Sequence, residues 1–281
     1  MNRYKTILSA SRMCDMPKYY PEAIISETMT RISKGVDIHT LVLWTKHPRS
    51  LLANPLYDFL KNLTARGVQL FIQLTITGMG GAITGVNKNG AWQIEPGSPS
   101  YAQSLEALPG VIELTGSPRR IKIRIDPLIK VKDYTGVIYS NISTFDQILE
   151  SASGLGIDNF SFSLLEPGFH AKVDRRFKSI GCEIIAFSGA EREALAGRFK
   201  ALEAAYKVKI NACCVEGFND SACIDGRLLS ALHPAGAVCD LREPRRRPKC
   251  GCVKSIDLGG WPVKRCGTGC DYCYANPLYS I

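Results

Sequence analysis

Closely spaced cysteines are the residues of this chain whose types and spacing most clearly indicate chemistry. The last 32 of its 281 residues hold five of its eleven cysteines, at Cys250, Cys252, Cys266, Cys270 and Cys273. Hydrophobic packing does not require five thiols so close together. A metal does, because several thiolates must reach one centre from a short piece of chain. The sequence therefore predicts a metal centre in this tail.

The last three cysteines have the spacing C-x3-C-x2-C and supply three thiolates, whereas an iron–sulfur cluster usually binds four. One iron of a [4Fe-4S] cluster held there would be open to another ligand. Gly267 and Gly269 allow the backbone to wrap tightly, and Lys264 and Arg265 would stabilise neighbouring thiolates. Zinc is the competing metal, since C-x-C and C-x2-C spacings also occur in zinc sites.

Further cysteines predict a second centre with a complete set of four thiolates. Its ligands would be one of an adjacent pair together with three others: Cys213 or Cys214, Cys223, Cys250 and Cys252. The alternative for the adjacent pair is a small, buried hydrophobic side chain at the end of a strand. We expect that buried role for three more cysteines, although the first lies near the predicted active face: Cys14, Cys182 and Cys239.

Composition places the chain among soluble globular proteins, with 45% hydrophobic and 22% charged residues. No apolar run approaches the roughly 18 residues of a membrane span, and the first residues do not form a signal peptide. We therefore expect a cytoplasmic protein, where disulfides are rare and dense cysteines bind metal or do chemistry. The net charge of +9 favours anionic partners such as nucleic acid, phosphate or a carboxylate.

Short β-rich runs alternate with helical patterns along most of the chain. The expected strands are Thr6–Ser9, His39–Trp44, Gln69–Thr75, Arg120–Ile125, Asn159–Leu165 and Val208–Cys213. The expected helices are Glu22–Ser33, Leu51–Arg66, Ser100–Ala107, Thr144–Ser153 and Ala190–Tyr206. This alternation predicts βαβ units and a parallel sheet. Because no G-x-G-x-x-G motif follows the first strand, a TIM-like full or partial β/α barrel is favoured over a dinucleotide-binding sheet.

Polar residues follow each expected strand, and in a parallel barrel these positions converge on the C-terminal face, where the chemistry takes place. The candidate catalytic residues are Arg12, Lys46, Arg124 and Asp126, and the candidate cofactor-binding residues are Ser11, Thr45, Thr75 and Thr77. Arginine and lysine could bind a carboxylate or phosphate, and the aspartate could pair with arginine or take a proton. The alternative is that these charges only pair structurally at the strand ends.

We expect two regions in the chain. Residues 1–212 would form the barrel, and residues 213–281 would form a cysteine-rich iron–sulfur segment packed on its C-terminal face. Residues 78–97, rich in glycine and asparagine, would form a mobile loop over that face. A basic connector, Arg242–Lys249, could bind nucleic-acid phosphates, offset the charge of a cluster or lie in solvent. The lack of interleaved aromatic residues favours the last two roles.

Several segments, which follow one another in the same order over nearly the whole chain, resemble motifs of the DUF1848 family. They are Ser9–Pro17, Leu43–Pro48, Gln73–Gly78, Arg124–Pro127, Cys250–Gly259 and Cys266–Asn276. These are similar to that family's S-A-S-R-x-T-D-I-P, F-W-T-K-N-P, Q-x-T-x-T-G, R-x-D-P, C-G-C-x-x-S-x-D-I-G and C-x3-C-x2-C-Y-A-N. The resemblance implies a radical-SAM-like iron–sulfur protein with a TIM-type barrel. Cys14 stands where the family usually has threonine.

The cysteine loop, with Tyr272 just before its last cysteine, also resembles the cluster loop of radical S-adenosylmethionine (SAM) enzymes. The resemblance implies an enzyme whose open [4Fe-4S] cluster binds SAM and passes it one electron, supplied by a donor such as ferredoxin or flavodoxin. In those enzymes the loop follows the first strand and a Gly-Gly-Glu-type motif ends the second. Here the loop closes the chain, and Trp44-Thr45-Lys46 ends the second strand.

Two alternatives to a radical SAM enzyme stay open. One is a SAM-independent iron–sulfur enzyme whose open iron acts as a Lewis acid or binds a small ligand. The other is a zinc-stabilised protein that binds nucleic acid. The substrate, a small or anionic molecule, does not follow from the fold class.

Overall fold

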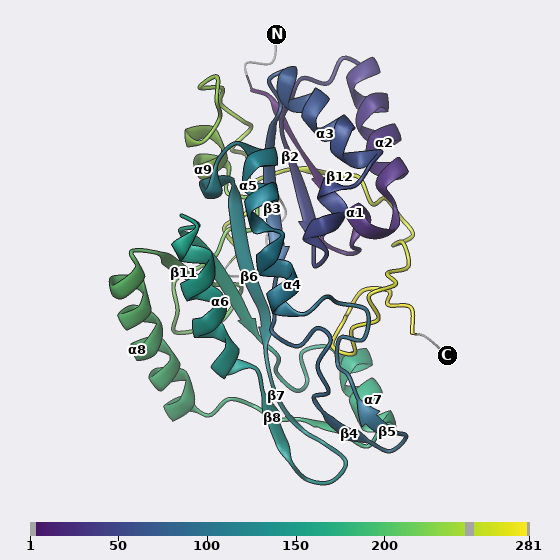
Figure 1. Cartoon of the computed structure of the whole chain (residues 1–281), viewed down its shortest axis with the longest axis vertical. Coiled ribbons are helices and arrows are strands. Elements are labelled where there is room, and N and C mark those ends of the chain that lie inside the picture. Colours follow the sequence, from purple (N-terminus) through teal and green to yellow (C-terminus); the bar gives the residue numbers. More distant parts are fainter. Residues whose placement is uncertain (1–3, 245–249, 280–281) are drawn as a thin grey trace.

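The computed structural model describes residues 4–244 and 250–279 of the chain. At its centre is a seven-stranded parallel sheet whose first six strands follow one another as neighbours (Figure 1). They are β1 (Thr6–Ala10), β2 (Ile38–Thr45), β3 (Gln69–Thr75), β6 (Ile121–Leu128), β9 (Asn159–Leu164) and β11 (Lys209–Ala212). All six expected strands are therefore confirmed, with small shifts at their ends.

The seventh strand comes from the cysteine-rich segment and was not expected. This strand, β12 (Ile256–Asp257), pairs in parallel with β1 through Leu8 opposite Ile256 and Ser9 opposite Asp257. Among the described residues the sheet runs from β11 at one edge to β12 at the other, and no pairing joins the two edges. The fold is thus an α/β structure with an open parallel sheet, consistent with a partial rather than a closed barrel.

Helices pack their apolar stripes on one face of this sheet, where they bury a large core. The connecting helices are α2 (Pro21–Ser33), η1 (Pro48–Leu52), α3 (Leu56–Ala65), α4 (Tyr101–Glu106), α5 (Leu108–Thr115), η2 (Pro118–Arg120), α6 (Ile142–Gly154) and α8 (Gly189–Tyr206). Shorter or peripheral helices are α1 (Met16–Tyr19), α7 (Ala171–Ser179) and α9 (Gly226–Ala231). Among the described residues, no helix has the length and apolar character that a membrane span requires.

Four of the five expected helices are confirmed, and the fifth is divided. The segment expected as Leu51–Arg66 forms η1 and α3 with a break before Leu56. Pro55 explains the break, because a proline disfavours helical backbone at the residue before it. The sequence reading missed α1, α5, α7 and α9, which are short or lack a clear apolar period.

The longest helix, α8, begins at a capping box and packs against the sheet through Phe199. Its start is a capping box in which the Ser188 hydroxyl accepts a hydrogen bond from the Glu191 backbone N–H at 3.3 Å. About three turns along the helix, Phe199 is buried and stacks on Phe145 with ring centroids 4.5 Å apart. It also meets Phe162 of β9 edge-on at 4.8 Å, which fixes the helix against the sheet.

The opposite face of the sheet carries polar side chains, because successive residues of a strand point to opposite faces. Gln69, Gln73 and Lys122 are all buried on it. Each donates to a backbone carbonyl of the cysteine-rich segment: Gln73 to Cys223, Gln69 to Leu229 at 3.0 Å, and Lys122 to Ala222 at 2.9 Å. Residues 222–229 therefore cover the face that the helices leave open.

The segment expected as a mobile loop, residues 78–97, is instead partly ordered by a hairpin. Strands β4 (Gly85–Asn87) and β5 (Gly90–Trp92) pair antiparallel, and Trp92, Ile94 and Glu95 beyond the turn are buried. Beside it lies a second small sheet of β7 (Lys130–Lys132), β8 (Ile138–Ser140) and β10 (Glu183–Ile184). The prediction of a loop missed this hairpin because its strands are only three residues long.

His39 of β2 joins the sheet to the covering segment. Its Nε2 donates to the Ala237 carbonyl at 3.0 Å, which leaves Nδ1 to accept from the Thr40 hydroxyl at 2.6 Å. The ring also lies 4.4 Å from that of His233, centroid to centroid. Burial therefore lowers the pKa of His39 to about 4, because the neutral ring is the form that this site holds.

We expect this histidine to make the folded state less stable in acid. At pH values between the unfolded pKa of 6.5 and the folded pKa of about 4, His39 is protonated in the unfolded chain but not in the folded protein. The free energy of unfolding should fall by about 2 kcal/mol between pH 7 and pH 5 through this group alone. In His39→Gln the fall measured by urea unfolding should be smaller by about that amount. Equal pH slopes in the two proteins would show that His39 does not contribute.

Candidate metal centre and active site

The tail loop, residues 266–273, is docked against the segment that follows the β4–β5 hairpin. The backbone N–H of Asp271 donates to the Ile94 carbonyl at 3.0 Å, and that of Gly97 donates to the Thr268 carbonyl at 3.1 Å. The Trp92 indole adds a hydrogen bond to the Asp271 carboxylate at 2.6 Å. These contacts hold the cysteines of the loop beside the ends of β2 and β3.

Both glycines of the tail loop are required by its geometry, as the sequence predicted. A side-chain carbon at Gly267 would lie 2.7 Å from a ring carbon of Tyr19, which is closer than van der Waals contact permits. Gly269 has a φ of +68°, in the left-handed region that favours glycine. The loop can therefore press against α1 and turn sharply between its cysteines.

The thiols of the tail loop lie close enough together to influence one another's pKa. The neighbouring Cys14 thiol lowers the pKa of Cys266 to about 5, and the Thr268 hydroxyl 3.5 Å away adds to the effect. Burial raises the pKa values of Cys270 and Cys273. Cys14 is buried, as expected, and in addition it contacts the first cysteine of the loop.

A buried ion pair lies next to the loop. The Nζ atom of Lys46 is 3.0 Å from Oε1 of Glu95, which also accepts hydrogen bonds from Thr77 at 2.7 Å and from Tyr272. Burial alone would lower the pKa of Lys46 and raise that of Glu95, but the ion pair outweighs burial and shifts both the opposite way. A fixed positive charge therefore faces Cys270, whose thiolate it would stabilise.

Sequence reasoning found Lys46 and Thr77 here but missed Glu95. The residue lies in the segment read as a loop, where no strand or helix period marks it as buried. Its partners come from three separate places in the chain, so only the tertiary structure brings them together. The one sequence signal was an acidic residue between Ile94 and a proline in an otherwise glycine-rich stretch.

Asp15 holds the ends of β1 and β2 together. Its buried carboxylate accepts hydrogen bonds from the Thr45 hydroxyl at 2.9 Å and from the Lys46 backbone N–H at 2.7 Å. Burial raises the pKa of Asp15, partly opposed by His47, whose Nε2 lies 4.0 Å away. The Thr45 hydroxyl is thus engaged by a neighbouring carboxylate, and its predicted role in binding a cofactor stays a prediction.

Arg124 and Asp126 form an ion pair on the polar face of the sheet, near the end of β6. The guanidinium also lies 4.9 Å from the ring centroid of Trp44 and 3.4 Å from the Thr75 hydroxyl. Burial opposes the charge of Arg124, but the carboxylate outweighs it and raises the arginine pKa. Ser163 of β9 donates a further hydrogen bond to Asp126. Side chains of neighbouring strands therefore hold the Arg124–Asp126 pair in place.

The remaining two predicted pocket residues are Arg12 and Ser11. Arg12 is exposed, and its guanidinium lies 5.9 Å from the ring centroid of Trp44, on which Arg124 also packs. Ser11 is buried and donates to the Asp257 carboxylate at 3.0 Å, which ties β1 to β12. Of the eight predicted pocket residues, Arg12 is thus the one that the structure leaves open to solvent.

A second group of cysteines gathers under the polar face of the sheet. Cys223 accepts hydrogen bonds from the thiols of Cys213 and Cys252, and these lower its pKa well below the usual value. The Cys252 sulfur also accepts from the Ile224 backbone N–H at 3.4 Å, and Cys250 packs against the same cluster. Of the adjacent pair, Cys213 is thus a neighbour of Cys223, while Cys214 has a left-handed φ of 56°.

A buried cation lies beside this second group. Lys122 is only 2% exposed, and its Nζ donates to the Ala222 carbonyl at 2.9 Å. Burial lowers its pKa, while negative charge on Cys223, Asp225 and Cys252 opposes the change. Within residues 4–244 and 250–279, no carboxylate forms an ion pair with it. The thiols of Cys223 and Cys252, with the more distant Asp225, are the groups placed to supply the balancing charge.

Both cysteine groups offer sulfur donors alone, which is the donor set of iron–sulfur and zinc–thiolate centres. The chemistry of the residues therefore fits a thiolate-bound metal. As placed, no three His, Cys, Asp or Glu side chains among the described residues converge closely enough to hold a single metal ion. The ligand sets drawn from the sequence accordingly stay predictions, supported by the proximity of the thiols.

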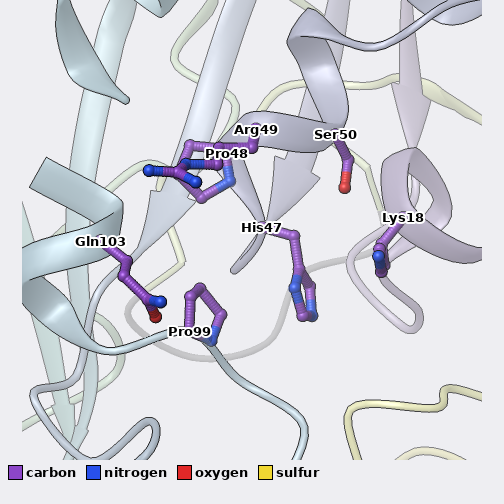
Figure 2. A pocket seen from close by; sticks show the side chains of 7 residues that line it. All are labelled: Lys18, His47, Pro48, Arg49, Ser50, Pro99 and Gln103. Carbon is purple, nitrogen blue, oxygen red and sulfur yellow. The ribbon is translucent and has the colours of Figure 1, made fainter. Parts of the chain in front are cut away.

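A cavity of about 190 Å³ opens beside the tail loop (Figure 2). Its lining carries a basic character and comes from α1, η1 and the start of α4: Lys18, His47, Pro48, Arg49, Ser50, Pro99 and Gln103. The His47 ring connects the cavity to the loop, since its Nε2 lies 3.3 Å from the Thr268 hydroxyl. Burial lowers the pKa of His47, which favours its neutral form.

Residues 7–275 match the model of a family described as a domain of unknown function, DUF1848. The chain belongs to the DUF1848 family. Among solved structures, a distant likeness is SuiB from Streptococcus suis, crystallised with S-adenosylmethionine bound. It has 10% sequence identity and a TM-score of 0.36, covering 82% of this chain and 49% of SuiB, so this DUF1848 protein spans about half the length of that one. No curated protein is a significant match to the sequence.

We expect Glu95→Gln to destabilise this DUF1848 protein by about 3 kcal/mol, because it leaves the Lys46 ammonium buried without its counter-charge. Urea unfolding of the two proteins at pH 7 measures the difference. Glu106→Gln is the matched control, because it breaks an ion pair with Arg49 in which both side chains are more than half exposed. The control should change stability by less than about 1 kcal/mol. Similar values for the two variants would contradict a special role for the buried pair.

Proposed function

We propose that this DUF1848 protein is an iron–sulfur enzyme of the radical SAM type. Cys266, Cys270 and Cys273 would hold a [4Fe-4S] cluster with one iron open to a small molecule. The second cysteine group, with Cys213 as the ligand from the adjacent pair, would hold a further cluster through Cys213, Cys223, Cys250 and Cys252. When bound, such a cluster supplies one-electron chemistry, and SAM is the small molecule on which that chemistry would act.

The buried ammonium of Lys122 is the observation that carries the metal assignment. A buried charge without a counter-charge costs several kcal/mol, and neutral thiols cannot offset it. A cluster bound by four thiolates carries net negative charge, so it would add to the charge that the Cys223 thiolate and Asp225 already direct at Lys122. The choice of iron over zinc rests on the three-cysteine spacing of the tail loop, which leaves one coordination position open.

Residues around the tail loop have roles that follow from their contacts. Lys46, fixed by Glu95, would offset the negative charge of the thiolates at Cys270. The docked loop and the buried side chains of Trp92 and Ile94 exclude water from that side. Low exposure strengthens every electrostatic interaction with the cluster. These residues position and protect the site.

Arg12 is the side chain best placed to bind an anionic group of a substrate or of SAM. Its guanidinium is exposed and packs near Trp44, whereas Lys46 and Arg124 are already engaged by carboxylates. Guanidinium groups bind carboxylates and phosphates through two parallel hydrogen bonds. A reduced ferredoxin or flavodoxin would supply the electron. The nucleic-acid role of the basic connector stays a prediction, because residues 245–249 lie outside the described residues.

Metal analysis of anaerobically purified protein tests the assignment of both sites. We expect iron and sulfide for two clusters in the wild-type chain and about half of that iron in two variants, each lacking one site: Cys270→Ala and Cys223→Ala. Cys182→Ala is the control, since this buried thiol packs in an apolar cluster 3.9 Å from the Val86 and Ile180 carbonyls and should leave the iron content unchanged. Zinc in place of iron would overturn the proposal and favour the zinc-stabilised alternative.

Incubation with SAM and dithionite tests the reaction class. The reconstituted wild-type protein should produce 5′-deoxyadenosine, measured by liquid chromatography, and Cys270→Ala should produce none. Arg12→Ala, which changes an exposed side chain, should retain its iron and lose at least half of the product through weaker binding of an anionic group. If iron-replete wild-type protein released no deoxyadenosine, the SAM-independent iron–sulfur enzyme would become the better assignment.

A further inference from the structure

Cys14 occupies an unusual place for a buried cysteine. It lies in the turn between β1 and α1, 6% exposed, and its thiol is 3.5 Å from the Arg265 carbonyl. Arg265 directly precedes Cys266, which packs against the same core cluster as Cys14 although it is 252 positions further along the chain. Cys14 therefore lies beside the start of the tail loop.

The turn that carries Cys14 is firmly held. Its neighbour Asp15 accepts hydrogen bonds from Thr45 and from the Lys46 backbone N–H, so the turn cannot move without disturbing the end of β2. The Tyr20 hydroxyl donates to the Arg265 carbonyl at 2.8 Å. That carbonyl would therefore keep a donor if the Cys14 thiol lost its proton. The site can accept a Cys14 thiolate without leaving a buried carbonyl unsatisfied.

We propose that Cys14 is the fourth thiolate ligand of the tail-loop cluster in its resting state. The inference rests on the proposed function, because it requires a cluster on Cys266, Cys270 and Cys273. Cys14 would give its proton to solvent and bond to the iron that those three leave open, with no change of oxidation state. A small molecule that binds this iron must then displace Cys14, which makes the site closed at rest and open only on ligand binding.

Two other buried cysteines, Cys182 and Cys239, lack this arrangement. Cys182 contacts the carbonyls of Val86 and Ile180, and Cys239 contacts the Gly226 carbonyl and the Ser230 hydroxyl. These are the contacts expected of a thiol that serves only as a small hydrophobic side chain. Cys14 differs because its carbonyl contact is Arg265, the residue directly before Cys266 of the predicted cluster loop.

Oxidation of the anaerobic holoprotein with ferricyanide tests the proposal. A [4Fe-4S] cluster with three cysteine ligands loses its open iron on oxidation and leaves a [3Fe-4S] cluster, which electron paramagnetic resonance detects. We expect little of this signal from the wild-type chain and from Cys182→Ala. Cys14→Ala should give about one [3Fe-4S] cluster per chain.

Cyanide binding provides a second measurement, because cyanide can occupy an open iron in the reduced cluster. If Cys14 is bound nine-tenths of the time, the cyanide concentration for half-saturation should fall about tenfold in Cys14→Ala. Cys14→Thr should behave like Cys14→Ala, since threonine keeps a hydroxyl donor for the Arg265 carbonyl but does not replace the thiolate. Agreement between the two variants separates the loss of a ligand from a loss of packing.

The outcomes also separate this inference from the proposed function. If iron-replete wild-type and Cys14→Ala proteins gave equal [3Fe-4S] signals, or if Cys14→Thr behaved like the wild type, Cys14 would not be a ligand, although the cluster would stand. If neither protein contained iron, the proposed function would fail and this inference with it. Circular dichroism of both variants confirms that they are folded before the comparison is made.

Discussion

Buried hydrogen-bond donors on the open face of the sheet are the constraint on which the rest of the structure depends. Gln69, Gln73 and Lys122 lie in adjacent strands and have no access to water. Burying such groups without partners would cost each of them the free energy of its lost hydrogen bonds to water. The backbone carbonyls of residues 222–229 satisfy all three. Because residues 222–229 cover this face, the cysteine-rich segment lies at the centre of the molecule.

The position of the cysteines follows from that cover. Once residues 222–229 lie against β3 and β6, Cys223 and Cys252 must face Lys122 in a region with almost no solvent. After this segment the chain adds β12 to the edge of the sheet beside β1, and the tail loop then reaches the ends of β2 and β3. The cysteine-rich segment thereby places one group of thiols under the polar face of the sheet and the other in the tail loop.

The two groups of thiols differ in the charged residues that surround them. Next to the tail loop, Lys46 has its own carboxylate in Glu95, so the site is close to neutral before any metal binds. Under the sheet, Lys122 donates to a backbone carbonyl, and the negative charge that acts on it comes from Cys223, Asp225 and Cys252 rather than from a close ion pair. We infer that the inner group depends more strongly on metal for its stability, whereas the tail-loop group has an electrostatic environment prepared in advance.

Local pattern and spacing were enough to predict the six strands, the α/β class, the family and the importance of the cysteines. Tertiary structure decided that the barrel stays open, that β12 completes one edge, and that Glu95 and Asp15 organise Lys46 and Thr45. It also brought Cys14 against Cys266 and Cys213 against Cys223. These contacts join residues far apart in the chain, and no local period encodes which distant groups meet. They arise only when buried donors and charges find their partners during folding.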